Sequence, residues 1–181
     1  MSRGLALAGL VILLSASCKT AKPDPHAPQQ SLEGFTMTRS KDGVPVWKLK
    51  ARLAILREDT KKALLTEPVL EVQEEGKLVL RARALRGTAH IETHDVLLTG
   101  SAKLDFVQED SVLETEELQF VPATRQFKSD RDVVLRRPGA VIRGTGCVAG
   151  ADLSEVRVFN QRSVIQPGAA NRGTGLRGSS R

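Results

Sequence analysis

Apolar and charged side chains alternate through residues 46–56, VWKLKARLAIL. Lys48, Lys50 and Arg52 fall between five apolar residues, which are Trp47, Leu49, Ala51, Leu53 and Ile55. Successive side chains of a β-strand point to opposite faces, whereas a helix would scatter these positions around its surface. The pattern therefore predicts one long strand, with its apolar set towards an interior and its cations towards water.

The preceding residues predict the hairpin partner of this strand. Phe35 and Met37 alternate with threonines within residues 33–39, and Ser40-Lys41-Asp42-Gly43 has the composition of a tight turn. We expect this short run to pair with residues 46–56 as an antiparallel hairpin.

Residues 69–165 repeat one arrangement, a β-rich run followed by a polar turn. The runs lie at residues 69–73, 78–85, 98–106, 113–120 and 127–135, with further apolar positions at 141 and 156–159. The spacing from Leu80 to Leu85 recurs from Leu113 to Leu118, offset by 33 residues, which indicates hairpins stacked along an axis. We predict an all-β fold.

Two arrangements would cover the apolar faces of these strands. Two twisted sheets could pack face to face, or they could splay and leave an apolar trough for lipid. Aromatic residues make up only 3% of the chain, so few large side chains are present to fill a closed core. The spacing of the apolar residues agrees with both arrangements.

The N-terminus has the pattern of an export signal. Arg3 precedes an uncharged apolar run at residues 5–14, which is shorter than the roughly 20 residues of a membrane-spanning helix. The small residues before Cys18 resemble a bacterial lipobox, although Ser15 stands where that pattern most often has leucine. The sequence predicts a signal peptide over residues 1–17 and a lipid on Cys18; an ordinary cleavage site or an uncleaved anchor is the alternative.

Polar and proline-rich residues predict a tether over residues 18–33, and a Gly-, Ser- and Arg-rich composition predicts a disordered tail over residues 166–181. The folded domain is then residues 34–165. When Arg3 and the three arginines of the tail are left out, 23 basic and 21 acidic residues remain, so the net charge falls from +6 to +2. This balance, with no basic run and few aromatics, argues against nucleic-acid binding.

No motif predicts catalysis, a cofactor or a metal site. His90 and His94 would lie about 13 Å apart on a strand, so we interpret them as solvent-facing residues beside a turn. The acidic residues 109–117 lack the spacing of a calcium loop. Gly144-Thr145-Gly146 lacks the lysine of a phosphate loop and predicts a kink, a bulge or a close backbone approach. Cys147 is predicted to be a small packed residue, with a bridge to Cys18 as the alternative.

An ordered set of motifs lies within residues 34–165. The set is Gly43-x-x-x-Trp47-x-Leu49-x-Ala51, Pro68, Leu113-x-Thr115-x-x-Leu118-x-Phe120, Ser129-Asp130-x-x-Val133 and Gly144-x-Gly146. This order resembles the LptC family, the periplasmic components of the lipopolysaccharide-export machine. The family usually begins with a transmembrane helix, where this chain has a lipobox.

The resemblance implies a twisted, V-shaped β-jellyroll of stacked antiparallel strands, of the OstA-like type, without catalysis. It implies a relay that accepts lipopolysaccharide from an inner-membrane ABC transporter and passes it to a periplasmic jellyroll bridge protein. The strands near Phe35 to Leu56 would meet the transporter, and those from Val141 to Ile165 would meet the bridge protein by β-augmentation. The competing hypothesis is an envelope lipoprotein that serves as a structural or assembly adaptor without transporting lipid.

The implied groove would shelter the acyl chains of lipid A. Its expected lining is Trp47, Leu49, Leu70, Val72, Leu80, Leu104, Phe106 and Phe120. The expected location is the periplasmic side of the inner membrane, with a lipid on Cys18 as the anchor; the outer membrane is the alternative location.

Overall fold

The computed structural model describes residues 29–151 and 155–165, which form twelve β-strands in one continuous hydrogen-bonded sheet. All pairings are antiparallel, so the predicted all-β class is confirmed. Within these residues, no helix has the length and apolar character needed to span a membrane. The strands are β1 (Gln29–Lys41), β2 (Val44–Arg57), β3 (Lys62–Thr66), β4 (Val69–Glu74), β5 (Lys77–Arg83), β6 (Arg86–His90), β7 (Val96–Phe106), β8 (Ser111–Val121), β9 (Gln126–Arg137), β10 (Ala140–Gly150), β11 (Val156–Val158) and β12 (Arg162–Ile165).

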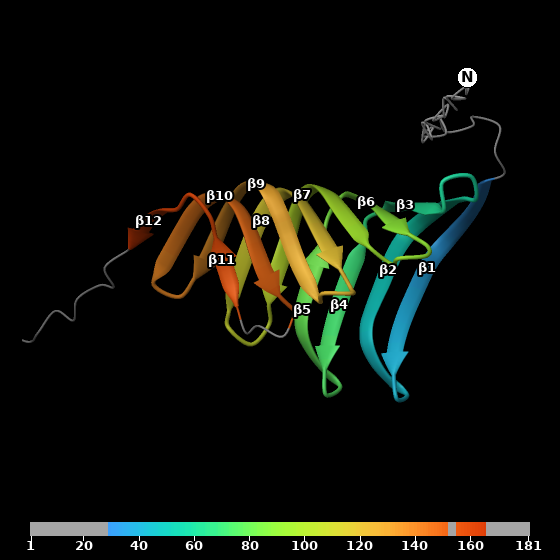
Figure 1. Cartoon of the computed structure of the whole chain (residues 1–181), viewed down its shortest axis with the longest axis horizontal. Coiled ribbons are helices and arrows are strands. Elements are labelled where there is room, and N and C mark those ends of the chain that lie inside the picture. Colours follow the sequence, from blue (N-terminus) through green and yellow to red (C-terminus); the bar gives the residue numbers. More distant parts are fainter. Residues whose placement is uncertain (1–28, 152–154, 166–181) are drawn as a thin grey trace, which may run out of the picture.

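The long strands run through two layers. Residues 47–50 of β2 pair with β4, and residues 53–57 pair with β3. Similarly, β7 pairs with β6 through residues 96–99 and with β5 through residues 103–106. We call the layer that contains β4 and β5 the first layer, and the layer that contains β3 and β6 the second layer. Figure 1 shows the strands stacked along the long axis, with β1 at one end and β12 at the other.

Local irregularities mark the points where strands pass between the layers. In β7, Gly100 and Ser101 have φ angles of 81° and 54°, and the register with β8 shifts there. In β10, Gly146 has a φ of 84° at a second register shift. Gly144 lies beside it, where an added Cβ would come within 2.3 Å of the Phe159 carbonyl oxygen. The register shift at Gly146 and the close approach at Gly144 confirm the prediction of a bulge or a close backbone approach at Gly144-Thr145-Gly146.

The β1–β2 hairpin is confirmed, with Phe35 opposite Ala51 and Met37 opposite Leu49. Asp42 and Gly43, with φ angles of 52° and 81°, form the tight turn, as the Asp-Gly pair favours. However, β1 begins at Gln29, earlier than the predicted domain start at Gly34. The tether prediction is wrong for residues 29–33, because the long β2 strand provides backbone partners for them from Leu53 to Arg57.

The prediction of a single apolar face along β2 is correct only as far as Ala51. Trp47, Leu49 and Ala51 are buried, but Ala54 is then fully buried while Leu53 and Ile55 are only partly buried. The inward parity changes because β2 leaves the first layer and enters the second between Lys50 and Leu53. A strand that changes layers must exchange the face that it turns towards the core.

One hydrophobic cluster fills the space between the layers. Phe120 packs on Phe127 with a 4.7 Å centroid distance. The buried hydroxyls of Thr115 and Ser129 lie 3.0 Å apart, and the Thr115 hydroxyl donates to the Asp132 carbonyl oxygen at 2.9 Å. These bonds satisfy the polar groups where β8 and β9 cross between layers.

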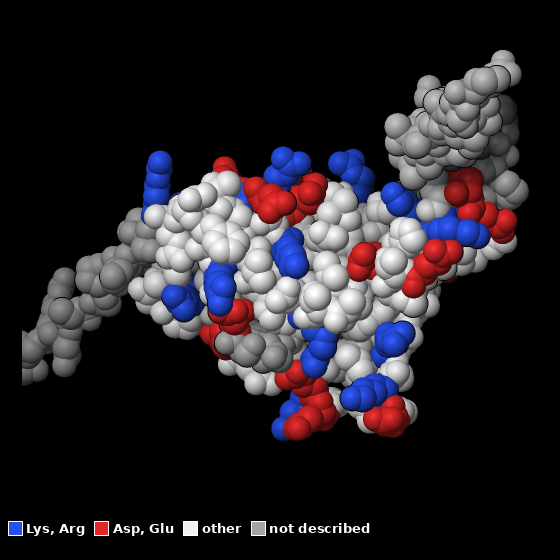
Figure 2. All heavy atoms as spheres, in the orientation of Figure 1, with Lys and Arg blue, Asp and Glu red and all other residues white. Residues whose placement is uncertain are grey.

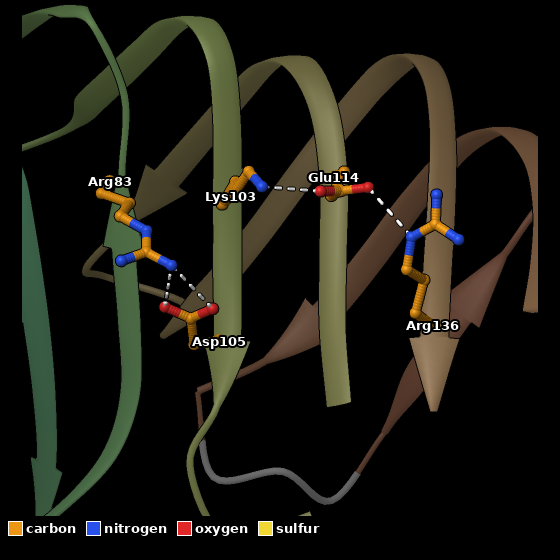
Figure 3. A network of polar contacts seen from close by, with 5 residues as sticks. All are labelled: Arg83, Lys103, Asp105, Glu114 and Arg136. Carbon is orange, nitrogen blue, oxygen red and sulfur yellow. Dashed lines mark hydrogen bonds and ion pairs between the residues drawn. The ribbon is translucent and has the colours of Figure 1, made fainter. Parts of the chain in front are cut away.

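Ion pairs cross neighbouring strands on the outer face of the first layer. Glu114 of β8 accepts contacts from Lys103 at 2.8 Å and from Arg136 at 3.2 Å, and Arg83 contacts Asp105 at 3.3 Å (Figure 3). The two cations hold the pKa of Glu114 below its usual value, mainly through the hydrogen bond from Lys103. Opposite charges on paired strands support the register, and they make this face unsuitable for apolar ligands.

The Glu114 contacts predict a pH-dependent contribution to stability. Because the pKa is lowered in the folded state, the stabilisation is present above the ordinary value of 4.5 and is lost as the pH falls through the folded-state pKa. Glu114→Gln should therefore unfold at lower urea concentration than the wild type at pH 7, and the difference should shrink below pH 4.5.

The matched control is Glu92→Gln, which removes an exposed carboxylate in the β6–β7 turn that forms no ion pair with any described residue. Its unfolding midpoint should follow that of the wild type from pH 7 to pH 3. A Glu114→Gln difference that stays constant over this range would contradict the prediction.

Candidate lipid-binding groove

The structure places all eight residues of the predicted lining between the two layers, in one buried cluster. Each has at most 3% of its surface exposed: Trp47, Leu49, Leu70, Val72, Leu80, Leu104, Phe106 and Phe120. All belong to the first layer except Phe120, which lies in the second-layer half of β8 and faces Trp47 at a ring-centroid distance of 6.4 Å. The layers therefore meet over these residues, and their role in binding lipid stays a prediction.

The interior opens beside Trp47. A slot of about 230 Å³ is lined there by residues that include Trp47, Val72 and Phe120, the members of the predicted lining that reach it. A wider trough of about 780 Å³ adjoins the slot and shares Lys41, Val46 and Arg125 with it. We call the slot and the trough together the mouth. Most of the interior is packed shut, and at the mouth its apolar surface meets solvent.

Two β-bulges shape the mouth. The β1–β2 register shifts between Arg39 and Ser40, which leaves Val46 as an extra residue in β2. The β4–β5 register shifts between Val72 and Gln73, which leaves Val79 as an extra residue in β5. A bulge bends its strand, and both extra valines line the trough. The ends of the β1–β2 and β4–β5 hairpins, which project from the body in Figure 1, thus give the trough its apolar wall.

An ion pair crosses the mouth between the two layers. The Arg125 Nη2 atom, in the β8–β9 turn, lies 2.6 Å from the Glu74 Oε1 atom at the end of β4. The Arg125 carbonyl oxygen also accepts a hydrogen bond from the Ala151 amide at 2.7 Å, which ties down its turn. Both side chains are substantially exposed, so the pair contributes on the order of 0–1 kcal/mol to stability. A competing anion could displace such a weak pair.

The rim of the mouth has mixed charge. Figure 2 shows basic and acidic side chains together at the tips of the β1–β2 and β4–β5 hairpins, where Lys41, Asp42, Glu75 and Lys77 line the trough. The sequence indicated the turns but not this rim. Arg125 in particular lies 51 positions from Glu74 in the chain, and no local pattern shows that two residues so far apart will meet.

The two histidines have a different environment from the predicted one. His94 has a φ of 63°, and its amide donates to the His90 carbonyl oxygen at 2.8 Å, which confirms the turn. Both side chains are partly buried, and the His94 ring lies 6.0 Å from the ring of Trp47. The solvent-facing interpretation is therefore wrong for His94, which covers one edge of Trp47. No group of potential ligands able to hold a metal occurs among the described residues.

Cys147 is buried in the second-layer half of β10, as predicted. Burial raises the pKa of its thiol to about 11, although a backbone hydrogen bond at Ser129 acts in the opposite direction. A thiol with this pKa is mostly protonated at neutral pH and is a poor nucleophile. Cys18, its suggested disulfide partner, lies outside the described residues.

The LptC-related family of lipopolysaccharide-assembly proteins matches residues 4–166. The chain belongs to this family. Membership gives it a role in lipopolysaccharide transport as a periplasmic component. Among solved structures, the chain is similar to LptH from Pseudomonas aeruginosa, described as the LptA homologous periplasmic component of the lipopolysaccharide transport device. That match has 12% identity and a TM-score of 0.49, and covers 81% of this chain and 100% of LptH. No curated protein matches the chain.

Because Cys147 is buried, its thiol is predicted to react slowly with alkylating reagents. In a Cys18→Ser protein, alkylation at pH 7.5 should be about 100-fold slower in the folded state than in urea, because a pKa of about 11 rather than 9.0 lowers the thiolate fraction by that factor. A second thiol introduced by Val46→Cys at the mouth should react rapidly. Equal rates at both positions would contradict a closed interior around Cys147.

Proposed function

We propose that this LptC-related protein is a non-catalytic relay, which accepts lipopolysaccharide from an inner-membrane ABC transporter and passes it to a periplasmic bridge protein. The observation that best supports the proposal is the continuous apolar interior between two layers, with a mouth beside Trp47. The outer face of the first layer instead has charged side chains in ion pairs. Acyl chains would therefore be sheltered between the layers and not on the outside.

The energetics agree with a relay. Burying about ten acyl methylenes would contribute roughly 8 kcal/mol at ~0.8 kcal/mol each, whereas one polar contact contributes about 1 kcal/mol. The interior is packed, so the layers must separate as the chains enter, and lipid contacts would replace contacts between the layers. Transfer then requires a similar affinity in the next domain, with energy supplied by the transporter.

The two ends of the sheet suit different partners. Among the described strands, β1 pairs only with β2, so its other edge offers free backbone groups at one end of the molecule. At the opposite end, β11 and β12 pair only with β10 (Figure 1). We assign the N-terminal edge to the transporter and the C-terminal edge to the bridge protein, each joined by β-augmentation.

Site-specific photocrosslinking tests the relay. Photoreactive residues at Leu49 and Leu104, on the inner face, should label lipopolysaccharide in cells with an active transporter. The same residue at Lys48 or Lys50, on the outer face of β2, should label it weakly. Leu49 and Lys50 are matched neighbours, because they differ in the face of the strand and not in its position along the molecule.

Labelling at Lys48 and Lys50 without labelling at Leu49 or Leu104 would reverse the assignment of the faces. Thermal unfolding of each purified variant provides the control for folding, since both leucines are fully buried.

One observation favours the alternative function of a structural or assembly adaptor. The eight predicted groove residues are already packed against one another, as in an ordinary core. An adaptor would join neighbouring proteins through its sheet edges and would leave this core closed. It should therefore crosslink to its protein partners through β1 and show no lipid label at either leucine.

We further propose that the protein is held at the periplasmic side of the inner membrane by a lipid on Cys18. This residue and the tether before Gln29 lie outside the described residues, and the proposal depends on the small residues that precede Cys18. Globomycin, which blocks the lipoprotein signal peptidase, should cause a larger precursor to accumulate, and Cys18→Ser should prevent lipid attachment. Unchanged processing in globomycin would rule out this anchor.

A further inference from the structure

The mouth combines an apolar slot with three cationic side chains. Arg39, Lys41 and Arg125 line the slot together with Trp47 and Phe120. Arg39 is directly opposite Trp47 in the β1–β2 register, so both side chains lie on the same face of the sheet. The inner face of β1 thus ends in a cation beside the apolar interior. An inward charge of this kind needs a counter-ion when the mouth is occupied.

The three cations differ in their present partners. Arg125 contacts Glu74 at 2.6 Å, whereas neither Arg39 nor Lys41 forms an ion pair with a described residue. Arg39 and Lys41 are therefore available to an incoming anion, and Arg125 becomes available when the anion displaces Glu74. Guanidinium groups bind phosphate by two parallel hydrogen bonds, which a single contact with a carboxylate does not match.

We propose that the mouth binds an anionic amphiphile. Its phosphate displaces Glu74 from Arg125, while its acyl chain enters the slot against Trp47 and Phe120. Glu74 and Arg125 then act as a latch between the layers. When the latch is closed, it links β4 of the first layer to the β8–β9 turn of the second. When phosphate replaces the carboxylate, this link between the layers is lost at the point where the chain must enter.

The inference rests on the proposed lipid-binding function and adds the headgroup chemistry and the position of the opening. The size of the mouth agrees with it. The slot of about 230 Å³ is smaller than a typical site for a whole ligand, whereas the trough of about 780 Å³ lies within the usual range of roughly 300–1,000 Å³. A single chain end would fit the slot, and the headgroup would occupy the wider, polar trough.

Trp47 provides the measurement, because it is the only tryptophan of the chain and lines the slot. The full chain with Cys18→Ser is titrated with dodecyl phosphate, with neutral dodecyl maltoside and with inorganic phosphate, each amphiphile below its micelle concentration. Dodecyl phosphate should change the Trp47 fluorescence saturably and with the highest affinity. Inorganic phosphate alone should cause little change, since it has no chain to enter the slot.

Four variants separate the latch from general charge effects. Arg125→Gln and the double variant Arg39→Gln/Lys41→Gln should each weaken dodecyl phosphate binding by about ten-fold, since each removes charge-assisted contacts. Glu74→Gln should strengthen it by about three-fold, because the competing carboxylate is gone. Arg136→Gln removes a cation from the outer face and should leave binding unchanged.

The opposite responses of Arg125→Gln and Glu74→Gln are the decisive comparison. If both variants weaken binding, the pair only maintains the shape of the mouth, and the proposal is overturned. It is also overturned if dodecyl maltoside binds as tightly as dodecyl phosphate, or if inorganic phosphate alone gives the full fluorescence change. In those cases, lipid labelling at Leu49 and Leu104 would still support the relay, whereas failure of that labelling would count against the relay itself.

Discussion

The structure depends on the burial of two apolar faces that the same strands provide. Because β2 and β7 to β10 each run through both layers, neither layer can form without the other. Apolar burial is non-directional and scales with area, so it holds the layers together without requiring particular side-chain pairs. The same property makes the interior suitable for acyl chains, which can replace one set of apolar contacts with another.

The distribution of charge limits where that exchange can begin. Ion pairs such as Lys103–Glu114–Arg136 cover the outer face of the first layer and keep that face polar and in contact with solvent. At the mouth, cations and carboxylates instead surround an apolar slot, and the weak Arg125–Glu74 ion pair joins the layers there. A domain that must take up and release the same lipid needs such a place, where separating the layers costs little.

Sequence patterns predicted much of the fold because the alternation of apolar and polar side chains along a strand involves only neighbouring residues. The β1–β2 hairpin, its Asp-Gly turn, the irregularity at Gly144 to Gly146 and the burial of Cys147 all follow from neighbouring residues. Alternation failed where a strand changes layers. Ala54 faces the core although Leu53 has the larger apolar side chain, because the position of the crossing depends on the pairing of β2 with β3 and β4.

Residues 46–56 show which features follow from the sequence and which depend on the tertiary structure. The sequence by itself determined that Trp47, Leu49 and Ala51 would face an apolar interior, because their alternation with lysines leaves no other amphipathic arrangement for a strand. Only the tertiary structure decided that this interior is packed shut around Leu49 yet open beside Trp47. The meeting of Trp47 with His94 and Phe120, and of Arg125 with Glu74, brings together residues distant in the chain, and no local pattern encodes such contacts.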